Sequence, residues 1–450
     1  MTGDEGRKVF AAILPQAEME HLCQQCGVME RERKLNLGMF VRAMVISAGT
    51  PGGAYQADVL RSYLECEVPH VVRSACYRWF DEPLARFMEA LAAHALAYAR
   101  AQAVDLSGPL CDVQDWYIVD ATTVTVRDAL RAECPGAGDD AAIKVHTVLS
   151  VGCGAPGAYH FSPAREHDSR HLQIDASWRG CGVLADLAYA SLERLRACDA
   201  HGVRVVLRLQ EHGKPKVDDV ARGPVTQAFF PGTDVDALLA EETLVLDGRA
   251  IDADVPVGQG RQALPRRLVG VQTPKGDCCF LPNLPPRIGP RQVADRYRVR
   301  WEVERSIRLD QSVHRLDAID AERPCALKTL LHASRLASTI AALLAPTHTV
   351  HTRPPQLGTP RREAPLHPRR LALQLAVSCQ SIAQAFELQG AEATRRWNKI
   401  AELLTHSGRD PNWRRRPSVL DQLRGWKRQP RVHKKANGGN VRKGNLKAAA

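Results

Sequence analysis

The sequence predicts an α/β protein in which a mixed β-sheet flanked by helices lies between helical N-terminal and C-terminal regions. The chain has 450 residues, 44% of them hydrophobic and 25% charged, so it is long enough to bury a substantial core. Short β-branched runs begin near residue 117, three in succession and then in alternation with helical stretches. That order favours a mixed sheet with helices packed on it.

Residues 1–110 predict an all-helical N-terminal region suited to binding DNA. Apolar residues recur at three- and four-residue intervals in Leu37–Ile46 and Phe87–Tyr98. Between them, Val71–Phe80 predicts a short helix with basic and aromatic side chains, including Arg73. Such a helix suits a DNA groove, but a half-buried helix has the same pattern, and both interpretations stay open.

Residues 111–209 and 290–320 predict the core of the protein, and 210–289 a β-rich insertion between its two parts. The insertion is rich in Pro and Gly, with short strand-like runs. Strands are expected at Tyr117–Val126, Lys144–Val151, Tyr159–Ser162, Val183–Leu184 and Val203–Leu209, and a helix at Ser191–Ala200. Shorter strands are expected in the insertion at Glu242–Leu246 and Arg267–Val271.

A long helix is predicted over Arg291–Leu316, and residues 321–406 form a helical C-terminal region interrupted by the Pro-rich stretch Thr347–Pro368. The most apolar part, Leu336–Leu344, is too short to cross a membrane and follows Arg335. We therefore expect no membrane partner.

The positive charge of the chain is concentrated at its end, in residues 407–450. This segment has thirteen Lys or Arg against two Asp, a surplus equal to the net charge of +11 of the whole chain. A flexible basic segment among Gly, Pro and Asn gains affinity for nucleic acid by releasing counterions. The alternative is a terminus that only improves solubility.

The thirteen cysteines do not indicate a disulfide scaffold, because the number is odd and the chain is long. No signal peptide pattern opens the sequence, so we expect a cytoplasmic, nucleoid-associated protein. Cys23 and Cys26 have no second pair at zinc-finger spacing, which favours an ordinary helix or surface role.

Two aspartates lie in or beside predicted strands. Asp120 interrupts the apolar and β-branched run Tyr117–Val126, and Asp186 ends Val183-Leu-Ala-Asp186. A carboxylate in a buried strand is costly unless a partner or a metal compensates its charge. Asp120 alone also suits a sheet edge, but two such carboxylates converge if their strands are neighbours.

A third acid lies on the helix predicted after the insertion. At 100° per residue, Tyr297, Arg300, Glu304 and Gln311 line one helix face. The simplest interpretation is a surface ion pair between Arg300 and Glu304, worth about 0.3 to 0.5 kcal/mol. The alternative is a metal ligand beside a phosphate clamp.

Several blocks together resemble bacterial insertion-sequence transposases of the DDE type, in insertion-sequence family four, which has a Tyr-Arg-Glu-Lys signature. The blocks, which follow the family's order along the chain, are Val119-Asp120-Ala-Thr-Thr-Val124, Lys144-Val-His146, Asp168, Val183-Leu-Ala-Asp186-Leu-Ala-Tyr189, Arg208-Leu209 and Tyr297-Arg-Val-Arg300-Trp-Glu-Val-Glu304.

The resemblance implies a ribonuclease-H-like core in which Asp120, Asp186 and Glu304 are catalytic and hold two Mg²⁺ ions, with Mn²⁺ as a substitute. Oxygen ligands suit such hard cations, and two metals serve both the attacking and the leaving oxygen of a phosphodiester. The residues expected to contact DNA are Tyr297, Arg300, Arg208 and Lys144.

The implied function is a transposase that binds the terminal inverted repeats of its element on double-stranded DNA, cleaves there and joins the ends to target DNA as a homodimer. Two departures stand out: Gln311 replaces the signature lysine, and Leu187-Ala188 replaces an Arg-Gly pair. The alternatives are therefore a catalytically impaired, transposase-derived DNA-binding protein and a nuclease of the same fold.

A zinc site at His167, Asp168 and His171 is a further possibility, because the two histidines are four residues apart. The order of a zinc-protease helix is missing, and so is a third ligand nearby. A capping or phosphate-facing role for Asp168 and Arg170 is favoured.

Overall fold

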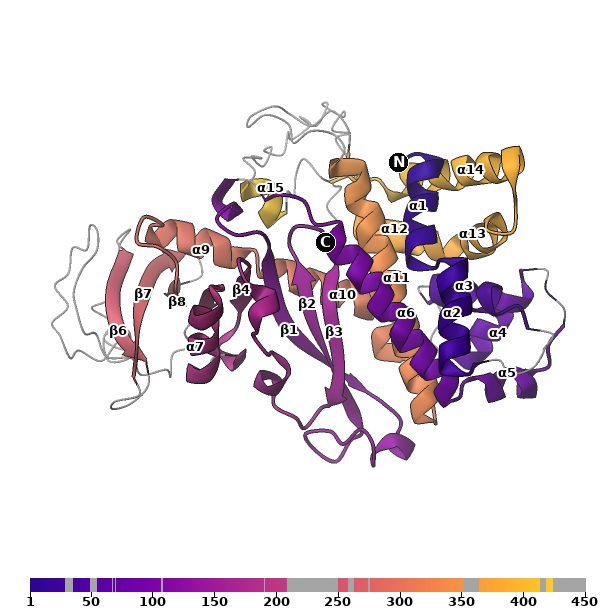
Figure 1. The fold of residues 1–450 in the computed structure, drawn as a ribbon, viewed down its shortest axis with the longest axis horizontal. Helices are drawn as coiled ribbons and strands as arrows, with labels where there is room; N and C mark the ends of the chain where they lie inside the picture. Colours follow the sequence, from indigo (N-terminus) through magenta and orange to yellow (C-terminus); the bar gives the residue numbers. More distant parts are fainter. Residues whose placement is uncertain are drawn as a thin grey trace, which may run out of the picture.

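A computed structural model describes residues 1–28, 35–48, 55–66, 68, 70–106, 108–189, 191–208, 250–257, 263–273, 276–350, 364–412 and 418–423. In the described part, a mixed sheet lies beside a helical unit built from both ends of the chain (Figure 1).

The sheet has the ribonuclease-H-like arrangement that the sequence analysis expected. Strands β1, β2 and β3 form an antiparallel meander, and β4 and β5 continue from the other side of β1 in parallel. Helix α7, Leu192–His201, connects the parallel strands β4 and β5. The bounds are β1 Trp116–Thr125, β2 Ala142–Ser150, β3 Pro156–Pro163, β4 Gly182–Ala185 and β5 Arg204–Arg208.

Close packing of a tryptophan explains a glycine in β4. Trp116, fully buried, is the register partner of Gly182. A Cβ on Gly182 would lie 2.4 Å from the Trp116 ring, closer than carbon atoms approach. A larger residue here would push β4 away from β1, the two strands that carry the aspartates.

The predicted β-rich insertion continues the main sheet. Strands β6 (Ala250–Val257), β7 (Leu264–Thr273) and β8 (Gly276–Pro282) form an antiparallel set, and β8 pairs with β5. The result is one eight-stranded sheet in the order β3-β2-β1-β4-β5-β8-β7-β6. The strand predicted at Arg267–Val271 lies within β7, whereas Glu242–Leu246 lies outside the described residues.

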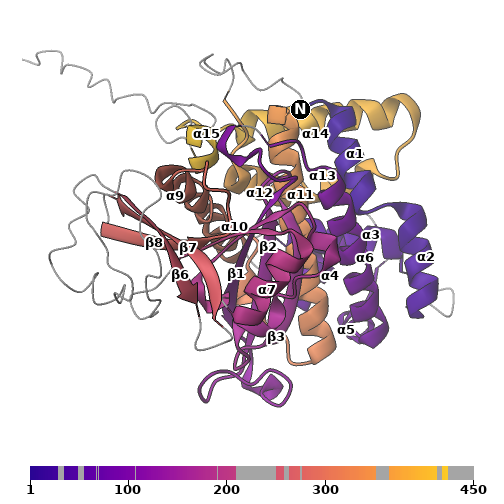
Figure 2. The same ribbon diagram turned by 60° about the vertical axis from the view of Figure 1, so that its left-hand side comes forward.

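The helices of the two chain ends share one hydrophobic core, which also receives Val124 and Val145 from the sheet. The predicted helices Leu37–Ile46 and Phe87–Tyr98 fall in α3 and α6, and α6 packs on α11 (Figures 1 and 2). The bounds are α1 Gly3–Ile13, α2 Gln16–Cys26, α3 Leu37–Ser47, α4 Gln56–Leu64, α5 Arg73–Trp79, α6 Glu82–Ala101, α11 Pro324–Val350, α12 Pro368–Val377, α13 Cys379–Ala385 and α14 Gly390–Gly408.

The single helix predicted over Arg291–Leu316 is two helices, α9 (Pro290–Arg298) and α10 (Trp301–Ser312). Between them the backbone bonds span three residues: Val299 N–H donates to the Arg296 carbonyl and Glu302 N–H to the Val299 carbonyl. Such 3₁₀ turns are tighter than an α-helix and rotate the side chains that follow. The prediction of one unbroken helix over Arg291–Leu316 is therefore wrong.

Only the start of the basic C-terminal segment is within the described residues. A short helix, α15 (Val419–Leu423), packs its apolar side chains on the core that contains α9. Gln422 accepts a hydrogen bond of 2.9 Å from Arg298. Among the helices in the described ranges, none combines the length and apolarity needed to cross a bilayer.

Candidate active site

Strand β1 presents Asp120 on the sheet face that helix α10 covers. Its neighbours on that face are Ile118, fully buried, and Thr122. The Asp120 carboxylate accepts a hydrogen bond of 2.9 Å from the Ala121 N–H and lies 3.2 Å from a guanidinium nitrogen of Arg300. The side chain is 26% exposed, so it is reachable from solvent.

The pairing of β1 with β4 brings Asp186 near Asp120, close enough for its charge to act on that carboxyl group. Ile118 pairs with Leu184 in parallel, and each aspartate follows its strand residue by two positions. Paired residues of parallel strands project to the same face. The expected convergence of the two strand-borne aspartates is thus built into the strand pairing.

Helix α10 supplies Glu304, and Arg300 joins it to Asp120. The Arg300 guanidinium donates to the Glu304 carboxylate at 2.7 Å and to Asp120 at 3.2 Å. Arg300 is 14% exposed and Glu304 24%. Arg308, 73% exposed, lies 4.0 Å from the other oxygen of Glu304.

The electrostatic setting of Asp120 is that of a carboxyl group among other carboxylates. Burial raises the pKa of Asp120, and the charges of Glu304 and Asp186 raise it further, against the Ala121 N–H and Arg300, which lower it. The three acids therefore repel one another, and a cation relieves the repulsion. In this structure that cation is Arg300.

The donor set fits a hard divalent cation, because Asp120, Asp186 and Glu304 offer carboxylate oxygens only. The distances among the three carboxylates, however, do not form a ready metal site. Within the described ranges, no three His, Cys, Asp or Glu side chains are close enough to hold one metal ion. Arg300 lies between Asp120 and Glu304, and its guanidinium nitrogens form ion pairs with an oxygen of each carboxylate.

Tyr297 and Arg208 lie next to this site, toward the extension of the sheet. Tyr297 packs on Phe280, with ring centroids 5.0 Å apart, and the Arg300 guanidinium lies 5.8 Å from its ring centroid. Burial raises the pKa of Tyr297, and Arg300 lowers it. Arg208, the register partner of Phe280, is exposed at the end of β5.

Gln311, which replaces the signature lysine, faces the same strand as the acids. Its side-chain amide donates to the Thr122 hydroxyl at 2.9 Å. Thr122 is two residues along β1 from Asp120 and shares its face. A cation at position 311 would therefore lie beside Thr122, two residues along β1 from Asp120.

Lys144 lies on the opposite face of the sheet, because it pairs with Thr123, the neighbour of Thr122. Its ammonium group lies 2.7 Å from Asp168 and donates to the Glu166 carbonyl at 2.7 Å. Contact of Lys144 with a phosphate would require this pair to open.

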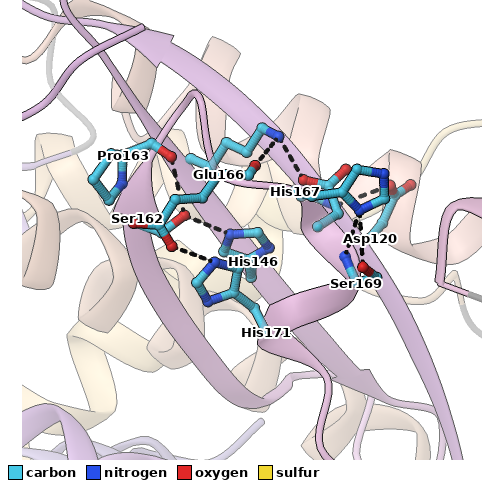
Figure 3. Close-up of polar contacts among 11 residues, drawn as sticks. Asp120, His146, Ser162, Pro163, Glu166, His167, Ser169 and His171 are labelled. Carbon is cyan, nitrogen blue, oxygen red and sulfur yellow. Dashed lines mark hydrogen bonds and ion pairs between the residues drawn. The ribbon is translucent and has the colours of Figure 1, made fainter. Parts of the chain in front are cut away.

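Three histidines stack beside Lys144 on that opposite face. His171 lies between His146 and His160, with ring centroids 4.2 and 4.9 Å apart. His146 forms a hydrogen bond of 2.9 Å with Ser162, and His171 lies 3.0 Å from a carboxylate oxygen of Glu166. Both contacts are drawn in Figure 3. Burial lowers the pKa of His146 to about 4, helped by the charge of His171.

The alternative zinc site is not assembled. His167 bonds to Ser169, Asp168 pairs with Lys144, and His171 pairs with Glu166. His167 also accepts from the Ser169 N–H and so caps the short 3₁₀ helix Asp168–His171. The cap is thus His167, whereas the capping role was expected of Asp168 and Arg170, and Asp168 pairs with Lys144 instead. All thirteen cysteines, Cys23 and Cys26 included, are free thiols.

The short basic helix predicted within Val71–Phe80 is α5, Arg73–Trp79. Arg73 and Arg78 are exposed, and the Arg73 guanidinium lies 4.9 Å from the Tyr77 ring centroid. Cys76 is fully buried, so the inner face of α5 belongs to the helical core. The outer face keeps the charges that DNA contact would need.

Sequence reasoning missed a buried ion pair behind the site. Asp310 of α10 and Arg335 of α11 are 1% and 0% exposed and are paired with each other. The Arg335 guanidinium also lies 5.1 Å from the Tyr159 ring centroid. The available signal was an arginine next to the most apolar run of the chain, which requires a buried acidic partner.

Comparison with known proteins agrees with this arrangement. Residues 114–340, which contain the whole site, match the transposase DDE domain family. The chain belongs to that family and is a transposase of the DDE type. A search of curated proteins found no match.

A solved structure with a similar chain path is described as a piggyBac transposase synaptic complex with hairpin DNA. It is 11% identical in sequence and has a TM-score of 0.46, over 91% of this chain and 89% of that one.

Proposed function

We propose that the protein binds the terminal inverted repeats of an insertion sequence, cleaves DNA at those ends, and joins them to target DNA in a reaction that depends on divalent metal. The observation that carries the proposal is the meeting of Asp120, Asp186 and Glu304 at one sheet face, within a chain of the transposase DDE domain family. Placement in the bacterial insertion-sequence family four rests on the sequence blocks.

In this proposal Asp120, Asp186 and Glu304 hold two Mg²⁺ ions, for which Mn²⁺ substitutes. The ions supply an activated oxygen nucleophile and a stabilised leaving oxygen for phosphodiester chemistry. The chain itself positions the DNA. Arg300 offers a planar fork of donors that matches a phosphate, and Arg208 adds an exposed charge near Tyr297.

Tyr297 sets the position of Arg300 in this proposal, because its ring packs on Phe280 and lies next to the guanidinium. Lys144 contributes to DNA contact only from the far side of the sheet, once its pair with Asp168 opens. Two transposon ends must be joined together, so the working form on DNA is a homodimer.

The test is cleavage of a duplex that carries the element's terminus, with Mg²⁺ or Mn²⁺. The parent is expected to cut it and to yield joined product, whereas Asp120→Asn and Glu304→Gln bind it without cutting. Glu302→Gln removes a carboxylate two positions away, which pairs with Arg305 at 2.8 Å, and is the matched control. Equal cutting by Glu304→Gln and Glu302→Gln would sink the assignment.

The same assay separates the alternatives. Gln311 in place of the signature lysine is the observation that favours a catalytically impaired DNA-binding protein. That protein would bind the terminus and cut with neither metal. A nuclease of the same fold would cut without forming joined product.

A further inference from the structure

Arg300 lies between two of the three acids that are proposed as metal ligands. Its guanidinium donates to Asp120 on β1 and to Glu304 on α10, and so bridges the two elements. It stands at the 3₁₀ junction that begins α10, with its backbone in the helical region. This position follows from the tight turn between α9 and α10.

The bridge is a partly desolvated contact. Arg300 is 14% exposed, and its two carboxylate partners are 26% and 24% exposed. Charge pairs sheltered from solvent are screened less than surface pairs, so each contact holds the carboxylates more strongly. A metal ion that takes oxygens from Asp120 and Glu304 must remove those contacts.

We propose that Arg300 is an internal counterion that competes with divalent metal for Asp120 and Glu304, and that DNA phosphate releases it. The inference rests on the proposed function of the three acids as metal ligands. Metal binds weakly while Arg300 bridges the carboxylates. A phosphate offers the guanidinium another bidentate partner and frees both acids.

Binding of DNA and binding of metal are then coupled. If DNA raises the affinity of the site for metal, metal raises the affinity for DNA by the same factor. The coupling confines metal-dependent chemistry to the complex with DNA. This coupling requires only that Arg300 exchange its two carboxylate partners for a DNA phosphate.

The test measures Mn²⁺ binding without DNA by electron paramagnetic resonance of the free ion. Arg300→Gln removes the bridge and is expected to bind Mn²⁺ about tenfold or more tightly than the parent, since a unit charge is removed next to the ligands. Arg308→Gln is the matched control. It removes the same charge from an exposed side chain 4.0 Å from Glu304 and is expected to change the affinity by less than about twofold.

Two further measurements keep the outcomes distinct. Arg300→Lys keeps the charge without the fork and is expected to lie between parent and Arg300→Gln; it also serves if Arg300→Gln does not fold. The second measurement adds a duplex and subtracts the Mn²⁺ that the duplex binds alone. The duplex is expected to raise the Mn²⁺ affinity of the parent and to leave that of Arg300→Gln unchanged.

Equal Mn²⁺ affinity in the parent, Arg300→Gln and Arg308→Gln would overturn the counterion role, and so would equal tightening by DNA in the parent and Arg300→Gln. Failure of the proposed function looks different: Asp120→Asn would then leave Mn²⁺ binding unchanged in every background. A parent that binds Mn²⁺ through Asp120 but is indifferent to Arg300 keeps the metal site and rejects this inference.

Discussion

Loss of either partner of the Arg335–Asp310 ion pair is expected to destabilise the protein strongly. The pair joins α10, which carries Glu304, to α11 of the helical unit. Asp310→Leu leaves the Arg335 guanidinium buried without its carboxylate, and Arg335→Met leaves the carboxylate without its cation. The double variant removes both charges.

The magnitude follows from the burial of the pair. Both side chains are almost wholly inaccessible, at 0% and 1% exposed. An uncompensated charge in such a place costs about 3 to 5 kcal/mol, while replacement of both partners by apolar residues is often close to neutral. The Tyr159 ring, 5.1 Å away, offsets part of the cost in Asp310→Leu by at most about 2 kcal/mol.

The assay is urea unfolding at neutral pH, followed by far-UV circular dichroism. Each single variant is expected to lower the unfolding midpoint markedly, and the double variant less than either. Lys328→Met changes an exposed charge on the same helix and serves as the control, with an effect within about 0.5 kcal/mol. Single variants that match Lys328→Met would refute the reasoning.

Three further predictions concern pH, the basic C-terminal segment (the tail, residues 407–450) and position 311. Burial lowers the pKa of His146, His314 and His332 to about 4, below the ordinary 6.5. The unfolded chain therefore takes up protons first, and the melting temperature should fall as pH drops from 6.5 toward 4; a flat profile would contradict this. If the tail binds phosphate, deletion of residues 424–450 should flatten the plot of log DNA affinity against log salt, and an unchanged slope would leave the tail a solubilising role only. Gln311→Lys should steepen that plot by about 0.9, the value for one added phosphate contact, whereas no change would place position 311 away from DNA.

The strands of the sheet were predictable because β-branched runs are local signals. All five core strands lie at or within a few residues of their predicted places. Helix α7 lies between β4 and β5, as predicted. The continuation of the sheet into the insertion was not predictable. It depends on pairing of Arg208 with Phe280, residues far apart in the chain, which no local pattern encodes.

The acids of the site were predictable from their setting, but their contacts were not. Asp120 stood out as a carboxylate in an apolar strand, and the one-turn spacing of Arg300 and Glu304 predicted their ion pair. The additional contact of Arg300 with Asp120 follows from the 3₁₀ turn before α10, where periodicity predicted an unbroken helix. The ion pair of Arg335 was not predictable from the sequence, since its partner Asp310 comes from another helix.

The most direct test of the metal site is anomalous diffraction at the manganese edge from crystals grown with Mn²⁺ and a duplex of the element's terminus. Manganese peaks are expected in contact with Asp120, Asp186 and Glu304, with the Arg300 guanidinium on a DNA phosphate. Peaks elsewhere, with Arg300 still bridging Asp120 and Glu304, would contradict the account.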